Sequence, residues 1–145
     1  MIEESVLIDT SALIALFNRN DPAHRACATL SKSLPVGKVY TCWPVLTEAA
    51  YLLRKHHRQR AGLLLSVHRG DYQILALDSS DLLAIEAVFS DYHDQQVDLA
   101  DAALVHLGNR EGIETVFTTD RRHFSVYRLE NGRTFHLLPE SDFLQ

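Results

Sequence analysis

The sequence predicts an α/β fold, with a mainly parallel sheet covered by helices on both faces. Short apolar, β-branched segments alternate along the chain with longer segments in which apolar residues recur at helical spacing. This alternation is typical of open parallel sheets, whose strands are buried on both sides. With 145 residues, the chain is about one domain long, so a single domain over residues 1–145 is expected.

The first half of the chain is expected to hold two strands and four helices. Residues 5–8 are short, apolar and followed by a polar cluster, which indicates a buried strand. Asp21 before Pro22 resembles a helix N-cap followed by a proline in the first turn. The expected elements are a strand at 5–8, a helix at 11–18, a helix from Asp21 to Leu34, a strand at 38–42, a helix from Pro44 with a basic tail at 54–58, and a helix at 60–68.

The second half is expected to continue the same alternation. Gly112 suits the end of one helix, and Asn131-Gly132 suits a tight turn into the last strand. The expected elements are a strand at 72–77, a helix capped by Asp78 or Ser79, a helix at 98–110, a strand at 115–118, a short helix from Asp120, and a strand at 133–138.

Composition and charge exclude several classes of protein. No apolar run approaches the ~18 residues of a membrane span, and the acidic start of the chain is unlike a secretory signal. Cys27 and Cys42 lack a metal-ligand or redox spacing, which indicates free thiols in a reducing compartment, so we expect a cytoplasmic protein. The formal net charge of -5 excludes a protein that holds nucleic acid by bulk positive charge alone.

Four carboxylates stand where an open parallel sheet binds ligands, just after a strand or early in the next helix. Asp9 follows the first strand, and Asp120 follows the strand at 115–118. Glu48 and Asp101 lie in the first turns of their helices. We therefore expect all four side chains to open toward the same edge of the sheet.

Each of these carboxylates alone has an ordinary structural explanation, since Asp9 and Asp120 could cap helices and Glu48 could face solvent. Together they repel one another. Two carboxylates ~4 Å apart repel by ~1 kcal/mol in water and by ~4 kcal/mol at an effective dielectric constant of ~20. A divalent cation would relieve this repulsion, and hard oxygen ligands without cysteine or paired histidine favour Mg²⁺ or Mn²⁺ over zinc.

The same residues carry a resemblance to a family. Asp9-Thr10-Ser11 after the first strand, Glu48 after the second, and the segments at 98–104 and 118–125 together resemble the PIN domain. More narrowly, the chain resembles the VapC-type ribonuclease toxins of bacterial toxin–antitoxin pairs. The resemblance covers essentially the whole chain and implies a PIN-like three-layer α/β/α sandwich with a mainly parallel central sheet.

This resemblance implies a Mg²⁺-dependent endoribonuclease, with Mn²⁺ as the alternative metal, in which metal-activated water hydrolyses the phosphodiester and leaves 5′-phosphate and 3′-hydroxyl ends. The expected partners are transfer RNA or ribosomal RNA as substrate, a VapB-type antitoxin and a second copy of the chain, with no membrane. The implied catalytic and metal-ligating residues are Asp9, Glu48, Asp101 and Asp120. Ser11 and Thr118 are implied as supporting residues, and Asp98 as the N-cap of the Asp101 helix or, second, as outer-shell support for the metal.

Two groups of basic residues lie near the predicted acidic site or at a helix end. Arg121 and Arg122, beside Asp120, are candidate RNA contacts, whereas the basic run at 54–60 is interpreted as a solvated helix end. The main alternative function is a catalytically silent PIN-like module that binds RNA or protein; loss of an acidic residue would favour it, and none is missing. A phosphoacceptor receiver domain would need a lysine late in the chain, but the last is Lys55.

Overall fold

The computed structural model describes residues 1–140 and contains one five-stranded sheet in the order β3-β2-β1-β4-β5. Every neighbouring pair of strands is parallel, which confirms the predicted α/β class. The strands are β1 (Val6–Ile8), β2 (Val39–Thr41), β3 (Gln73–Ile74), β4 (Thr115–Phe117) and β5 (His136–Leu138). Because β1 is central and β4 is its neighbour, the ends of these two strands meet although more than 100 residues separate them.

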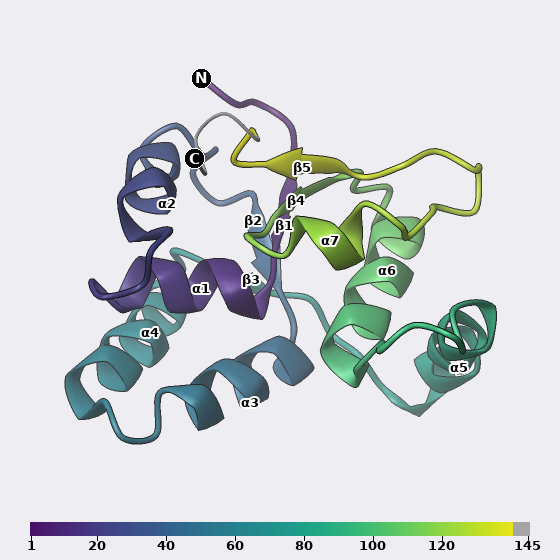
Figure 1. Cartoon of the computed structure of the whole chain (residues 1–145), viewed down its shortest axis with the longest axis horizontal. Helices are drawn as coiled ribbons and strands as arrows, with labels where there is room; N and C mark the ends of the chain where they lie inside the picture. Colours follow the sequence, from purple (N-terminus) through teal and green to yellow (C-terminus); the bar gives the residue numbers. More distant parts are fainter. Residues whose placement is uncertain (141–145) are drawn as a thin grey trace.

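Helices flank the strands on both sides, as predicted. Figure 1 shows α1 to α4 on one side of the strands and α5 to α7 on the other. The helices are α1 (Thr10–Phe17), α2 (His24–Ser31), α3 (Trp43–Leu52), α4 (His57–Arg69), α5 (Leu82–Asp91), α6 (Leu99–Glu111) and α7 (Arg121–Phe124), with a 3₁₀ turn, η1 (Ser79–Asp81), before α5. Over residues 1–140, no helix has the length and apolar character needed to cross a bilayer.

The boundaries predicted for three helices are wrong. The helix expected from Asp21 begins at His24, because the Asp21 carboxylate accepts a hydrogen bond from Ala23 N and closes a turn before the helix. It also ends at Ser31, before Leu34. The basic residues at 54–58 do not extend α3, which ends at Leu52. Residues 54–56 form the turn to α4, and His57 and Arg58 are the first residues of α4.

Two predicted strands are shorter than expected. The strand expected at 72–77 pairs with β2 only through Gln73 and Ile74, because it is at the edge of the sheet and the chain then turns toward η1. The strand expected at 133–138 pairs with β4 only from His136. Its first residues belong instead to a hairpin, in which Thr134 forms an antiparallel bridge to Arg128 around the predicted Asn131-Gly132 turn.

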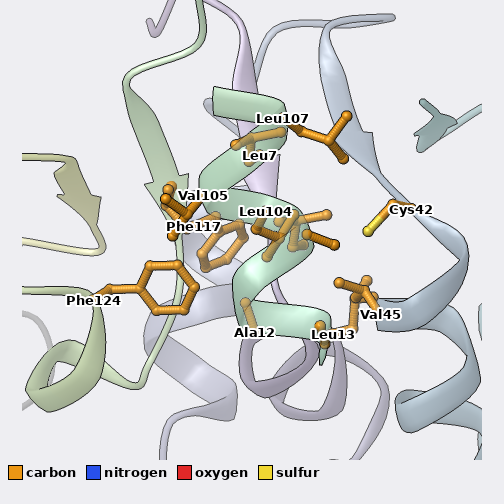
Figure 2. Close-up of a cluster of buried hydrophobic side chains, with 14 of the residues drawn as sticks. Leu7, Ala12, Leu13, Cys42, Val45, Leu104, Val105, Leu107, Phe117 and Phe124 are labelled. Atoms are coloured by element: carbon orange, nitrogen blue, oxygen red, sulfur yellow. The ribbon is translucent and has the colours of Figure 1, made fainter. Parts of the chain in front are cut away.

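The core is centred on α6 and the two central strands. Figure 2 shows Leu104 of α6 among Leu7 of β1, Phe117 of β4 and Leu13 of α1. The buried residues of α6 include small side chains as well as large ones, so this helix lies close to its neighbours. They are Ala100, Ala102, Ala103, Leu104, Val105, Leu107 and Gly108. Burial fixes the position of α6, and with it the position of Asp101 near its first turn.

Two helical glycines provide a matched test of this packing. A Cβ at Gly108 would lie 2.8 Å from a Phe135 ring carbon and 2.9 Å from Ile113 O, whereas a Cβ at Gly62 in α4 would lie no closer than 3.5 Å to Phe17. Gly108→Ala is therefore expected to destabilise the fold by ~1–3 kcal/mol through overpacking. Gly62→Ala is expected to stabilise it by ~0.5–1 kcal/mol by removing backbone freedom from the unfolded chain. Urea denaturation of both variants measures the difference, and two shifts of the same sign would contradict this view of α6.

Candidate active site

The acidic residues predicted from the sequence meet in one cleft of about 350 Å³ at the carboxyl ends of β1 and β4. The cleft is open to solvent on one side and receives side chains from α1, α3, α6 and the β4–α7 connection. Six of the predicted site residues line it: Asp9, Ser11, Glu48, Asp98, Asp101 and Asp120. Thr118, the seventh residue of the acidic and supporting set, is fully buried directly beneath Asp9.

Asp9 is the most deeply buried of the acids, with 4% of its surface exposed. It caps α1 through a hydrogen bond from Ala12 N to Oδ1 (2.9 Å), and Ser11 Oγ donates to the same oxygen (2.8 Å). Thr118 Oγ1 donates to the other oxygen, Oδ2, at 2.5 Å. Burial raises the pKa of Asp9 to about 6 although these three donors lower it, and the charge of Asp120 raises it further.

Ser11 and Thr118 connect the ends of β1 and β4. Thr118 Oγ1 donates to Asp9 and accepts from Asp120 N (2.9 Å), while Ser11 Oγ donates to Asp9 and accepts from Thr119 N (2.9 Å). Each hydroxyl thus uses its single proton on the Asp9 carboxylate and its lone pairs on the β4–α7 backbone. This network fixes the orientation of Asp9 and explains why two hydroxyl residues accompany it.

Asp101 is held from two directions. Asp98 caps α6 by accepting a hydrogen bond from Asp101 N (2.8 Å), which is the first of the two roles predicted for it. Tyr127 OH donates to Asp101 Oδ2 at 2.9 Å. Burial and the charge of Asp98 raise the pKa of Asp101 to about 7, the Tyr127 hydrogen bond opposes this, and the charges of Asp9 and Asp120 add to it.

Tyr127 is a residue of the site that the sequence did not reveal, as are Asp21 and Gln96, which line the cleft. Its ring is fully buried and packs edge-on against Phe124 and Tyr92, with centroids 5.2 and 5.1 Å away. The charge of Asp101 and burial both raise the pKa of Tyr127, so its hydroxyl stays protonated and donates. Its only sequence signal is its place seven residues after Asp120, and no spacing relates it to Asp101.

Glu48 and Asp120 complete the acidic set. Glu48 projects from the middle of α3 into the cleft, where burial raises its pKa, Thr10 partly opposes this and the charge of Asp98 raises it further. Asp120 caps α7, and its Oδ2 lies 2.8 Å from Nδ1 of His123. Asp120 therefore has an imidazole as its side-chain partner, whereas the side-chain partners of Asp9 and Asp101 are hydroxyl groups.

The two arginines predicted as RNA contacts do not line the cleft. Arg121 Nη1 donates to Pro139 O at 2.6 Å, which ties its guanidinium to the chain after β5. Arg122 is exposed on α7. Contact with RNA stays a prediction for both, and it would have to occur outside the acidic cleft.

The donor chemistry of the cleft fits a hydrated divalent cation. Among residues 1–140, six carboxyl side chains line it (the four predicted acids, Asp98 and Asp21) and no lysine or arginine does. Within the same residues, no three His, Cys, Asp or Glu side chains are arranged to hold an ion directly. An all-oxygen, open site of this kind suits Mg²⁺ or Mn²⁺, which keep several waters and need few protein ligands.

Removing the Tyr127 hydroxyl tests its contact with Asp101. Tyr127→Phe keeps the buried ring, so we expect a folded protein whose affinity for Mn²⁺ and rate of RNA cleavage each fall by about 10- to 100-fold, the usual cost of removing an outer partner of a metal ligand. Calorimetric titration with Mn²⁺ measures the first effect. Tyr92→Phe is the matched control, since its hydroxyl accepts from Arg128 N and not from the cleft. Equal metal affinity in both variants would contradict the assignment.

Comparisons with known proteins agree with this geometry. The PIN domain model matches residues 6–129. Ribonuclease VapC26 of Mycobacterium tuberculosis is 32% identical over 136 residues, which is 92% of this chain and 100% of that protein.

Two solved structures have a similar fold. VapC20 of Mycobacterium tuberculosis, described as a sarcin-ricin loop cleaving toxin, superposes with a TM-score of 0.73 at 21% identity, over 81% of this chain and 91% of that one. A toxin-antitoxin complex from Klebsiella pneumoniae gives a TM-score of 0.66 at 19% identity, over 84% and 92% of the two chains. The family match, the VapC relative and the shared fold agree: the chain belongs to the PIN domain family and, within it, to the VapC-type ribonucleases.

Proposed function

We propose that this protein is a metal-dependent endoribonuclease that acts as the toxin of a VapBC-type toxin–antitoxin pair. The observation that carries the proposal is the convergence of Asp9, Glu48, Asp101 and Asp120, from four separate segments, on one open cleft. Burying these carboxylates together is unfavourable by itself. Burial first, and then the charges of the neighbouring acids, raise the pKa values of Asp9 and Asp101. Kinship with Ribonuclease VapC26 supports RNA as the substrate.

In this proposal the four carboxylates would hold a hydrated Mg²⁺, in part through its bound waters, with Mn²⁺ as the alternative. The bound cation supplies charge neutralisation at the scissile phosphate and lowers the pKa of the attacking water. Ser11 and Thr118 keep the Asp9 carboxylate in one orientation, and Tyr127 does the same for Asp101. A cation held by these carboxylates would supply the activated water, so no side chain of this chain would need to form a covalent bond to RNA.

The proposed partners follow from the family. We infer a VapB-type antitoxin, a homodimer and action in the cytoplasm, since the chain is a VapC-type protein. Transfer RNA and ribosomal RNA are both retained as substrates; the sarcin-ricin loop named for VapC20 is an example of the second.

Mapping of RNA ends tests the proposal. Total RNA is incubated with the purified protein in Mg²⁺, in Mn²⁺ or in a chelator, and new ends are sequenced. We expect discrete cuts with 5′-phosphate ends that depend on the metal and are absent with Asp101→Asn. Binding of RNA without cleavage in either metal would favour the alternative, a catalytically silent PIN-like module.

A further inference from the structure

We propose that the connection between α3 and α4 binds phosphates of the same RNA strand that enters the acidic cleft. We call residues 54–60 the basic turn: they are the end of this connection and the first turn of α4, with the cations Arg54, Lys55, Arg58 and Arg60. The inference deepens the proposed function and rests on it. It replaces the interpretation of this run as the solvated end of one helix, because Arg54 and Lys55 follow α3 whereas Arg58 and Arg60 lie in the first turn of α4.

The basic turn carries charge that the protein does not neutralise. Within residues 1–140, Arg69, Arg110 and Arg133 each form a salt bridge with Asp or Glu, whereas no cation of the basic turn does. Arg54, Lys55 and Arg58 are exposed. In a chain with a net charge of -5, four cations without a salt bridge lie within seven residues, and three of them are exposed, so they form a local site for anions.

The turn also presents an ordered guanidinium beside an aromatic ring. Arg54 lies over the Tyr51 ring, 4.0 Å from its centroid, and its Nη1 donates to Tyr51 O (2.9 Å). The Tyr51 side chain is exposed, so the guanidinium and the ring are both accessible. A cationic surface with an exposed aromatic ring is the combination that binds single-stranded nucleic acid, through phosphate contacts and base stacking.

The position of the turn connects it to the cleft. Glu48 and Leu52 of α3 both line the cleft, and Arg54 follows Leu52 by two residues. From Glu48 to Leu52, the last residue of α3, the helix rises about 6 Å, a length of about two nucleotides in one strand. Figure 1 shows α1 and α3 running side by side away from the sheet toward this turn.

A second hollow extends this surface. It has a volume of about 590 Å³ and is lined by Arg58 from the turn, by Arg19 and His24, and by Leu16 and Phe17 of α1. Ile14 of the same helix lines the acidic cleft. A strand whose reacting phosphate lies in the cleft can therefore follow α1 and α3 to these cations, which offset the repulsion between RNA and the six carboxylates.

Salt-dependent binding tests the proposal. Asp101→Asn protein, used to prevent cleavage, is titrated with fluorescent single-stranded RNA at several KCl concentrations without divalent cations. Lys55→Gln/Arg58→Gln in this background removes two charges from side chains outside the cleft lining. We expect the slope of log K against log[KCl] to become shallower by about 1.4, at about 0.7 per lost phosphate contact on a single strand.

The matched control is Lys32→Gln/Lys38→Gln. It removes the same charge from two exposed lysines, of which Lys38 precedes β2 at the opposite end of the sheet from the cleft. We expect its slope to equal that of the parent. An unchanged slope for Lys55→Gln/Arg58→Gln overturns the assignment of the basic turn to RNA. It does so even if the same variant loses binding to an acidic protein partner.

The cleavage assay and the salt-dependent binding together distinguish a failure of this inference from a failure of the proposed function. Cleavage of RNA by the wild-type protein in Mg²⁺, together with an unchanged slope for the turn variant, overturns only the basic turn. A wild-type protein that neither cleaves nor binds RNA overturns both.

Discussion

Asp9→Asn and Asp101→Asn are each expected to reduce RNA cleavage by about 10³-fold or more, while the protein stays folded. Either change removes one of the charges that the proposed metal site needs, and a 10³-fold loss corresponds to about 4 kcal/mol of transition-state stabilisation. Neither changes side-chain volume appreciably. The asparagine oxygen at position 9 can still accept from Ala12 N, so α1 keeps its N-cap.

The same variants are expected to unfold at the same temperature as the wild type or higher. At pH 7 the wild-type protein keeps Asp9 mostly ionised at a site that raises its pKa to about 6, and this costs folding free energy that asparagine does not. Cleavage assays and thermal melts on the same samples measure both effects. Wild-type cleavage rates would remove Asp9 or Asp101 from the active site, whereas a large fall in melting temperature would assign the residue to folding.

The stability of the metal-free protein is expected to fall as pH rises from about 4 to about 7. Below pH 4 the carboxyl group of Asp9 is protonated in the folded and the unfolded protein, so it favours neither. Above pH 4 the unfolded chain loses this proton, with a pKa near 3.8, whereas the folded protein holds it until about pH 6. Once Asp9 is ionised in both states, this difference in pKa has lowered the free energy of unfolding by about 3 kcal/mol. Asp101, with a pKa near 7, acts in the same direction.

Added Mg²⁺ or Mn²⁺ is expected to restore this stability at pH 7 and to have little effect at pH 4, because only the ionised carboxylates hold a cation. Thermal melts across pH with a metal or a chelator measure the effect. Asp81 does not mask it, since hydrogen bonds lower its pKa to about 2, outside this range. The double variant Asp9→Asn/Asp101→Asn is the control and should melt with a smaller dependence on pH and on metal than the wild type, Glu48 being the remaining acid whose pKa burial raises. A wild-type protein that is more stable at pH 7 than at pH 4 without metal would contradict the prediction.

Much of the fold could be predicted from the sequence because its strands and helices carry local signals. The strand at 5–8 is apolar throughout and lies at the centre of the sheet, where every residue of β1 is buried. Boundaries that depend on tertiary contacts were wrong. Gln73 and Ile74 pair with β2, and Leu75 N adds one last hydrogen bond to Thr41 O before the strand ends. No local pattern tells an edge strand where its partner ends.

The acidic cleft was predictable for a topological reason. Parallel strands bring their carboxyl ends to one edge, so residues directly after β1 and β4 had to meet once the fold class was known. Contacts set by packing were not predictable in this way. Tyr127 reaches Asp101 only because the hairpin after α7 folds back onto Tyr92 and α6, and Arg121 turns to Pro139 instead of toward the cleft.

The network of Ser11 and Thr118 has a consequence for how activity arises during synthesis. Asp9 leaves the ribosome early, but the hydroxyl that orients its Oδ2 is 109 residues further along the chain, and the tyrosine that holds Asp101 comes later still. A nascent or truncated chain that ends before Thr118 therefore contains Asp9 and Asp101 without the groups that organise them. The active site is therefore complete only when the segment from Thr118 to Tyr127 has packed against the rest of the protein, so a chain terminated before Thr118 is expected to be inactive.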